Sequence, residues 1–539
     1  MPSRSASADS PASRRILAAG ACALAIAAAV AWTAAWHLRF TSLWYPDACD
    51  YAQLGRRILR DGSMTTGQSF PYVLAWLRAH ALATTAPWPN VTRFVLPALV
   101  RAASFSVFGV SDFAAVLPDA LFHCATVALC FVLGARLAGL AAGWSAAVLV
   151  AFSPTMLGYA LSGLSETGAG LLVLAAAAAV ACVVPDDRAA KGAARNAAVA
   201  GALIGLCFLQ RSNLVLLIIP AVALILGARG LGELRARARI AAVLCAACVA
   251  VASPWLLRNA WSFGTPTLSL TMDRNVGWAL LGKDVFYEFT LIDAGQVIRS
   301  HAADVVARLD PRPLAGHWSD FFGPDFGPLL PAFVVASVAV SLPPRARVLR
   351  TLTWATLLLS FVAFAPLVVG NFLDRYYEPF APLVVLLVVV QLAILARRFG
   401  RAGPAVLAVA CSLAPLWWIS HGFASTVARR DPALGQWDRW VSEAVAPDAV
   451  VASDQSWYVA WQADRPSVRF YGDGAQLAEL ERGYTPISAV WLTAADSRRF
   501  ELSIDAAGGA ARWRLVRRSD DGGSLWLAAP ATPVTPASP

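Results

Sequence analysis

The sequence predicts an α-helical polytopic membrane protein with about eleven transmembrane helices and a small α/β domain at its C-terminal end. Of its 539 residues, 58% are hydrophobic and 14% are charged, whereas soluble domains are about 45–50% apolar and about 25% charged. The apolar residues form long runs that are separated by short charged loops. After residue 420 the composition changes, and short strand and helix patterns replace the apolar runs.

The predicted spans follow from the roughly 17–25 apolar residues that a helix needs to cross a bilayer. The first run is longer than the roughly 7–15 apolar residues of a signal peptide, so we interpret it as a retained helix. The predicted spans are 16–38, 114–135, 138–158, 167–184, 196–210, 213–228, 240–257, 327–342, 351–370, 377–396 and 403–420.

Basic residues predict the orientation of the chain, because they gather in alternate loops, and such loops face the cytoplasm. The N-terminus is therefore expected in the cytoplasm and the C-terminal domain outside it. The Ala-rich, Lys-poor composition indicates a bacterium, and the expected location is its inner (plasma) membrane. The same loops account for the net charge of +10 without nucleic acid as a partner. They contain Arg14, Arg15, Arg136, Arg188, Lys191, Arg195, Arg229, Arg235, Arg237, Arg239, Arg345, Arg347, Arg350, Arg397, Arg398 and Arg401.

The C-terminal domain is predicted from alternating apolar patterns and turn residues. Its aromatic residues, among them Trp457 and Tyr471, form either its core or a face on which a carbohydrate stacks. Strands are expected at 448–454, 467–471 and 487–494, a hairpin at 512–516 and 524–528, and short helices near 456–461 and 476–482. The expected boundaries are 1–13 for a disordered N-terminus, 14–420 for the transmembrane domain with outer loops 39–113 and 258–326, 421–529 for the α/β domain, and 530–539 for a disordered tail.

Charged residues at the predicted outer ends of the spans are the candidates for chemistry, because ionised groups at a membrane rim are costly. Asp47, Asp50 and Tyr51 are three and four residues apart and would share one face of a helix. A carboxylate can act as a general base, and arginine can neutralise a phosphate. This mixture suits group transfer from a lipid-linked phosphate. The other candidates are Asp119, Glu166, Arg211, Arg258, Asn259 and Arg375.

Five motifs in order resemble those of GT-C fold glycosyltransferases, which are multi-spanning enzymes that use polyprenyl-phosphate sugars. The segment from Asp47 to Tyr51 resembles their D-x-x-x-Y motif. The resemblance covers roughly residues 10–420 and is nearest to the bacterial protein mannosyltransferase-like, aminoarabinose transferase-like and RgtA/B/C/D-like proteins. The other motifs are RFVLP (93–97) with the following SVFGVSDFAAVLPDAL, FSPTMLGYALSGLSET (152–167), SPWLLRNAWSFGTPTLSL (253–270) and DRYYEPFAPLVVLL (374–387).

The chain departs from the family pattern in two places. The segment RFVLP (93–97) lacks the first proline of the family's R-x-P-x-x-P motif, and residues 65–90 enlarge the first outer loop. Both departures bear on the choice of acceptor more than on the type of reaction.

The resemblance implies a hexosyl- or pentosyltransferase that moves a sugar from a polyprenyl phosphate to an acceptor hydroxyl on the outer face, with inversion. It implies that Asp47 is the general base and that Glu166 is a second acid, which positions the acceptor or binds a divalent metal. No cofactor is expected, and the histidines show no zinc-ligand spacing. The implied substrate-binding residues are Asp50, Tyr51, Arg93, Arg211, Arg258, Asn259, Arg375 and Tyr376.

Other readings of the same residues stay open. Asp47 could cap a helix. Glu166 could be a charge at a helix N-terminus that the helix dipole favours, and the arginines could extend to the membrane surface. The charges could instead line the path of a transporter or flippase for a lipid-linked or anionic substrate, although no internal repeat supports this. A third reading is a non-catalytic assembly or receptor protein. Glycan, lipid and protein acceptors are all compatible with the sequence.

Overall fold

The computed structural model describes residues 10–184, 192–309, 340–364, 374–400, 402–421, 434–506 and 512–529, with a few isolated positions between 331 and 367. The chain divides into two compact units, and each unit is assembled from three segments. The helical unit consists of Met1–Thr41, Phe94–Leu268 and Ile298–Arg429. The mixed unit consists of Ser42–Arg93, Ser269–Val297 and Arg430–Pro539.

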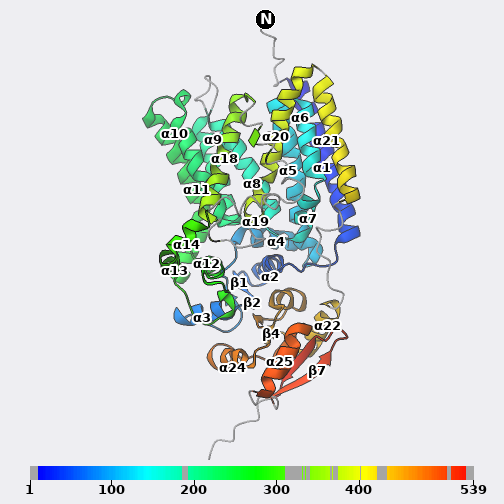
Figure 1. Ribbon diagram of the computed structural model, residues 1–539, viewed down its shortest axis with the longest axis vertical. Coiled ribbons are helices and arrows are strands. Elements are labelled where there is room, and N and C mark those ends of the chain that lie inside the picture. Colours follow the sequence, from blue (N-terminus) through cyan, green and yellow to red (C-terminus); the bar gives the residue numbers. More distant parts are fainter. Residues whose placement is uncertain are drawn as a thin grey trace, which may run out of the picture. The chain divides into compact units, whose positions relative to one another are not determined.

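The helical unit is a bundle of apolar helices, and Figure 1 shows α5, α8, α9 and α20 among those that run side by side. Its core is formed largely by alanine, valine and leucine side chains, so the helices pack closely. The helices are α1 (Pro11–Arg39), α4 (Val95–Phe108), α5 (Asp112–Ala138), α6 (Leu140–Ala151), α7 (Pro154–Ser162), α8 (Glu166–Val183), α9 (Ala193–Gln210), α10 (Ile218–Gly227), α11 (Leu234–Phe263), α14 (Ala302–Ala307), α18 (Pro344–Phe364), α19 (Asp374–Tyr377), α20 (Ala381–Ala396) and α21 (Ala402–His421).

The predicted polytopic membrane architecture is confirmed, although the predicted number of spans stays a prediction. In the described residues, seven helices are long and apolar enough to cross a membrane, or eight if one bent pair is a single span. The predicted span at 327–342 lies mostly outside the described residues. Residues 1–9 and the tail from residue 530, both predicted to be disordered, lie outside them as well. Helix α1 already begins at Pro11.

The predicted span at 138–158 stays a prediction, because the segment is not one continuous helix. The segment forms α6 and α7, which are bent by 54° at their junction. Pro154 is the first residue of α7 and has no N–H group, so it cannot continue the hydrogen bonds of α6. The Ser153 hydroxyl accepts a hydrogen bond from the Met156 amide at 3.1 Å and caps the new helix.

Helices α9 and α11 approach each other through glycine. A Cβ atom added at Gly201 would lie 2.0 Å from the Leu244 carbonyl oxygen, and one at Gly205 would lie 2.7 Å from that of Cys248. Small residues four positions apart allow helix backbones in membranes to come close together. These two glycines therefore allow the backbones of α9 and α11 to lie this close together.

We predict that Gly201→Ile destabilises the helical unit by about 1–3 kcal/mol, because the added side chain must displace the backbone of α11. The measurement is the thermal unfolding midpoint of the purified protein in detergent. Gly227→Ile is the matched control, because no atom lies within 4 Å of a Cβ atom built there. Equal midpoints for the two variants would contradict the assigned packing.

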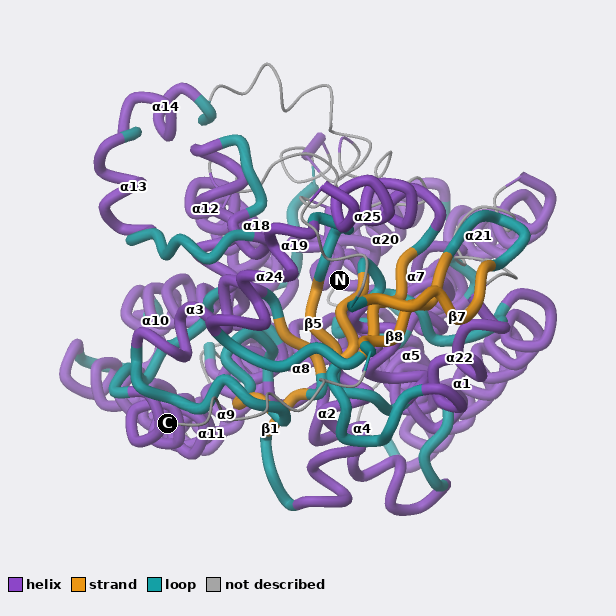
Figure 2. Tube along the Cα trace, turned by 90° about the horizontal axis from the view of Figure 1, so that it is seen from below, coloured by secondary structure: helices purple, strands orange, loops and turns teal. Residues whose placement is uncertain are grey.

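The mixed unit is built on a six-stranded sheet with the order β2-β5-β4-β6-β8-β7. Strands β2, β5, β4 and β6 are parallel, whereas β8 pairs antiparallel with β6 and with β7. Figure 2 shows β5, β8 and β7 of this sheet in orange. The strands are β2 (Gln68–Ser69), β4 (Val451–Ser453), β5 (Ser467–Arg469), β6 (Ala489–Leu492), β7 (Trp513–Arg518) and β8 (Ser524–Ala528), and β1 (Thr65–Thr66) pairs separately with β3 (Trp88–Pro89).

Both faces of the sheet are covered. On one face, Trp437 packs in a core with Trp491 and Tyr458. On the other, the Phe500 ring meets those of Phe470, Trp513 and Trp526 edge to face. The helices of the unit are α2 (Pro46–Asp61), α3 (Pro71–Ala79), α12 (Thr271–Leu281), α13 (Ala294–Ser300, which extends into the helical unit), α22 (Leu434–Ala444), α23 (Ser456–Tyr458), α24 (Gly474–Gly483) and α25 (Ala494–Ala506).

The predicted small C-terminal sheet is confirmed, and all five of its predicted strands are present. The sheet also takes a strand from the first loop: β2 pairs in parallel with β5, with Gln68 opposite Ser467. This strand was not predicted, because two residues are too few to show a pattern. The compact unit accordingly includes residues 42–93 and 269–297, which the expected boundaries of 421–529 leave out.

Candidate functional site

The first candidate cluster lies at the start of α2 in the mixed unit. Pro46 is the first helical residue, and Asp47 lies in the first turn. The Arg93 guanidinium contacts Asp47 Oδ1 at 2.6 Å and Asp50 Oδ2 at 2.6 Å. The side chains of Asp47, Arg93 and Asp50 are 23%, 14% and 2% exposed. The predicted face of the helix is thus present, and one arginine bridges its two carboxylates.

The charges in this cluster act on one another. Burial raises the pKa of Asp50 to about 6; Arg93 opposes this shift, and Asp47 adds to it. Asp50 Oδ1 is buried and has no hydrogen-bond partner in the described part of the chain. Burial alone would lower the pKa of Arg93, but Asp47 and Asp50 reverse this effect and raise it. Tyr51 is 2% exposed, and it also acts electrostatically on Arg93.

Asn90, which the sequence analysis did not identify, holds Arg93 in place. Its side-chain oxygen accepts hydrogen bonds from the amides of Thr92 at 3.3 Å and Arg93 at 2.9 Å. Its amide group donates to the Arg93 carbonyl at 3.0 Å. The Thr271 hydroxyl donates to the Thr92 carbonyl at 3.0 Å. Asn90 is 1% exposed, and asparagine commonly makes such local turns, which is the one signal that could have identified it.

The second cluster lies in the helical unit and surrounds Glu166, the first residue of α8. Glu166 Oε1 contacts Arg211 Nη1 at 2.8 Å and Arg375 Nε at 2.5 Å. The Arg211 guanidinium also lies 5.6 Å from the centre of the Tyr376 ring. Four predicted residues from three distant segments of the chain therefore meet here. Two arginines and one carboxylate leave one formal positive charge, which suits an anionic ligand.

A small cavity adjoins the second cluster. Its lining includes Glu166, His123, Tyr159 and Glu378. His123 is buried, and its Nε2 atom lies 3.2 Å from the Ala151 carbonyl oxygen. Glu378 was not identified from the sequence, although it lies inside the motif at 374–387. Within the described residues, no three histidine, cysteine or acidic side chains are grouped as metal ligands.

The remaining predicted residues form two further pairs in the helical unit. Asp119 Oδ2 contacts Arg101 Nη2 at 2.8 Å, and both side chains are at most 1% exposed. Arg101, a residue of α4 that the sequence analysis did not identify, also donates to the Pro97 carbonyl at 3.0 Å. Arg258 donates to Asn259 Oδ1 at 2.8 Å near the end of α11, and its guanidinium lies 4.6 Å from the centre of the Phe263 ring.

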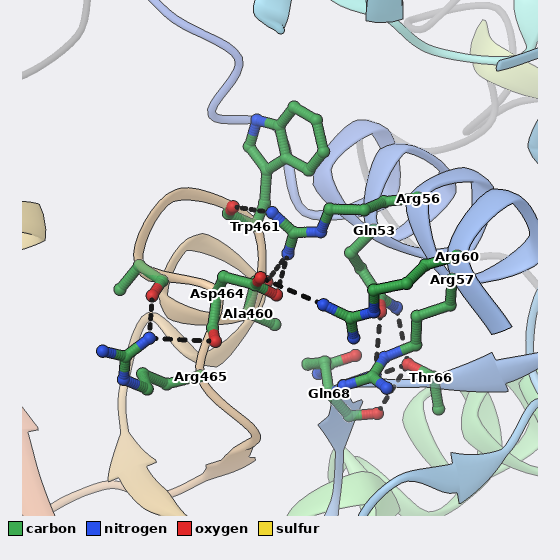
Figure 3. Close-up of polar contacts among 12 residues, drawn as sticks. Gln53, Arg56, Arg57, Arg60, Thr66, Gln68, Ala460, Trp461, Asp464 and Arg465 are labelled. Carbon is green, nitrogen blue, oxygen red and sulfur yellow. Dashed lines mark hydrogen bonds and ion pairs between the residues drawn. The ribbon is translucent and has the colours of Figure 1, made fainter. Parts of the chain in front are cut away.

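Helix α2, which carries Asp47, is held at both ends by the segment 457–464. Before the helix, Trp457 Nε1 donates to the Trp44 carbonyl at 3.1 Å, and Gln462 Nε2 donates to the Leu43 carbonyl at 3.1 Å. Near its other end, Arg56 contacts Asp464, as Figure 3 shows. The C-terminal domain therefore fixes the helix that presents the first cluster.

Arg56 is the main contact at that second end of α2. It donates to the carbonyls of Ala460 at 2.6 Å and Trp461 at 3.0 Å, and it contacts Asp464 Oδ1 at 2.8 Å. Burial lowers the pKa of Arg56 to about 10, and Asp464 opposes that shift, so Arg56 keeps its charge at neutral pH. Arg60 reaches the same carboxylate at 3.3 Å, but its side chain is 49% exposed.

Comparisons with known proteins bear on the fold of the chain. Residues 94–257 match the model of the family described as dolichyl-phosphate-mannose-protein mannosyltransferase. ArnT from Cupriavidus metallidurans, solved with undecaprenyl phosphate, is 15% identical, with a TM-score of 0.61 over 95% of this chain and 99% of that one. AglB from Archaeoglobus fulgidus, solved with an inhibitory peptide and a dolichol-phosphate, is 12% identical, with a TM-score of 0.57 over 96% and 75% of the two chains. A search of curated protein sequences found no match.

We predict that Arg56→Met lowers the free energy of unfolding by about 1–3 kcal/mol, because two carbonyls and a carboxylate lose their donor. The matched variant Arg60→Met loses only an exposed ion pair and should cost at most about 1 kcal/mol. Thermal unfolding in detergent measures both changes. A larger loss for Arg60→Met than for Arg56→Met would contradict the contacts of Figure 3.

We predict that Asp50→Asn changes the pH dependence of stability. The pKa of Asp50 is raised from 3.8 to about 6, so the folded protein holds this proton more tightly than the unfolded chain does. The stability that protonated Asp50 contributes is therefore lost as the pH rises from 3.8 to about 6. The free energy of unfolding of Asp50→Asn, taken relative to that of the wild type, should therefore rise by about 3 kcal/mol between about pH 4 and pH 7. Asp61→Asn, at the exposed end of α2, is the control, and a pH-independent difference for Asp50→Asn would refute the prediction.

The sequence motifs, the family match over residues 94–257 and the two structural likenesses agree, and they confirm the predicted resemblance: the chain has the GT-C fold.

Proposed function

We propose that the protein is a membrane glycosyltransferase that moves a sugar from a polyprenyl phosphate to an acceptor hydroxyl, with Asp47 as the general base. The single observation that carries this proposal is the Arg93 bridge, which orients Asp47 in a chain with the GT-C fold. The structures of ArnT with undecaprenyl phosphate and of AglB with dolichol-phosphate support a polyprenyl-phosphate donor.

The chemistry assigned to Asp47 follows from its surroundings. Its side chain is 23% exposed and can reach a substrate, whereas that of Asp50 is 2% exposed. Asp47 accepts the proton of the acceptor hydroxyl as the oxygen attacks the anomeric carbon. The bond from that carbon to the phosphate oxygen breaks on the opposite side, and polyprenyl phosphate leaves with the electron pair. A single displacement of this kind inverts the anomeric configuration.

The leaving phosphate needs cations. The cluster of Glu166, Arg211 and Arg375 supports this role, because it carries one net positive charge and arginine matches phosphate oxygens geometrically. We assign Arg211 and Arg375 to the phosphate, and Glu166 to holding both arginines in place. Arg258, near the end of α11, is a further candidate for the same role.

The proposed setting is the inner (plasma) membrane of a bacterium, with the N-terminus in the cytoplasm and the mixed unit outside it. The distribution of basic residues supports this orientation, because Arg136, Arg195, Arg235 and Arg397 all lie at helix ends that the predicted topology assigns to one side. A glycan, a lipid or a protein is the proposed class of acceptor.

We predict that Asp47→Asn lowers sugar transfer by about 10²–10⁴-fold, the usual contribution of a positioned general base. Purified protein is given a panel of polyprenyl-phosphate sugars with envelope acceptors, and the release of free polyprenyl phosphate is measured. Asp61→Asn, on the same helix, should transfer sugar at the wild-type rate. If Asp47→Asn binds the donor and transfers sugar normally, Asp47 is not the base. If the wild type releases no polyprenyl phosphate with any donor, the protein is not a transferase of this type.

A further inference from the structure

The sheet of the mixed unit contains a topological switch point. Strand β4 lies between β5 and β6, and the three strands are parallel. The chain therefore passes from β4 to a neighbour on one side and then crosses to the neighbour on the other side. In open sheets of this kind, ligands bind outside the carboxyl ends of the strands where the strand order reverses. Here that position is the carboxyl end of β4 and β6.

A carboxyl group occupies this position. Asp454 directly follows β4, and Thr493 directly follows β6. The Thr493 amide lies 3.2 Å from each carboxylate oxygen of Asp454, and its hydroxyl also donates to Asp454. Asp454 is 2% exposed. Asp496, which is half-buried, interacts electrostatically with Asp454 at the same edge.

Arg469, the last residue of β5, lies at the same edge with unused donors. It is 7% exposed, yet its Nε and Nη1 atoms have no hydrogen-bond partner in the described part of the chain. Its Nη2 atom donates to the Tyr471 hydroxyl at 3.2 Å. It makes no ion pair with any residue that the structure describes, although its charge acts on the nearby carboxyl groups of Asp454 and Asp496 and opposes the rise in pKa that burial causes there. A buried guanidinium with unsatisfied donors is costly and favours an anionic partner.

Aromatic rings surround this guanidinium. Its central carbon lies 4.1 Å from the centre of the Trp457 ring, 4.9 Å from that of Tyr471 and 5.6 Å from that of Tyr287. The side chains of all three residues are partly exposed, unlike the buried Tyr458 and Trp461 of the same unit. Partly exposed aromatic rings beside a cation offer a face for a sugar ring and donors for its charged substituent.

We propose that this edge of the sheet is a binding site for an anionic saccharide, a sugar unit that carries a carboxylate or a phosphate. The anion takes the place of the Tyr471 hydroxyl at Arg469, and the sugar ring lies against Tyr471 and Tyr287. Asp496 accepts a hydrogen bond from a sugar hydroxyl. If the proposed transferase function holds, this site holds the acceptor glycan; binding itself requires neither the donor nor Asp47.

The test is equilibrium binding of glucuronic acid to the full-length protein in detergent, followed by tryptophan fluorescence, with glucose as the uncharged probe. Glucuronic acid should bind saturably and at least about 10-fold more tightly than glucose. Arg469→Gln should weaken binding by about 10-fold to 100-fold. Arg514→Gln, at an exposed arginine of β7, should leave binding unchanged. No saturable binding of glucuronic acid, or equal binding by Arg469→Gln and the wild type, would overturn the proposal.

A second variant keeps the test decisive if Arg469→Gln does not fold. Tyr471→Phe removes the hydroxyl that the anion must displace, so glucuronic acid should bind more tightly; unchanged or weaker binding counts against the site. Asp47→Asn should bind glucuronic acid as the wild type does. Failure of this binding with intact transfer overturns only the saccharide site, and loss of transfer with intact binding overturns only the proposed enzymatic function.

Discussion

The bridge that Arg93 makes between Asp47 and Asp50 is the interaction on which the candidate catalytic centre depends. Two carboxylates one helical turn apart repel each other, and one of them is buried. The guanidinium offsets part of the repulsion and of the cost of burial, since the pKa of Asp50 stays raised to about 6. It fixes both side chains through contacts of 2.6 Å. Removing one partner of such a buried group typically costs about 3–5 kcal/mol, because the remaining charges lose their compensation. The partly exposed Asp47 is thereby left as the carboxylate that a substrate can reach.

The helix that carries this pair belongs to the α/β domain as much as to the first loop. Strand β2, a few residues after α2, extends the C-terminal sheet. The segment 457–464 contacts the backbone just before α2 and the Arg56 side chain near its end. The α/β domain, in which the sequence shows no catalytic motif, therefore holds in place the helix that carries Asp47. Trp457 links this role to the proposed saccharide site, because it contacts both Trp44 and Arg469.

The sequence predicted the parts of this structure that depend on local patterns. Apolar runs marked the helices, and alternating residues marked the C-terminal strands. Glu166, Arg211 and Arg375 were predicted to lie at one end of the spans, but their contacts with one another were not predicted. The turn at Asn90 and the pairing of Arg101 with Asp119 were not identified, because each depends on residues brought together by tertiary packing. The bend before Pro154 was missed because hydropathy alone does not show where a helix breaks.

The most direct test of this account is the rate of polyprenyl phosphate release by Arg93→Met and Arg93→Lys. The account predicts that Arg93→Met loses most of the activity while the Michaelis constant for the donor stays near the wild-type value, since Arg93 acts through Asp47. Arg93→Lys should recover part of the rate, because a single ammonium group can contact one carboxylate but does not reproduce the planar fork. Transfer at the wild-type rate by folded Arg93→Met protein would contradict the central role of this bridge.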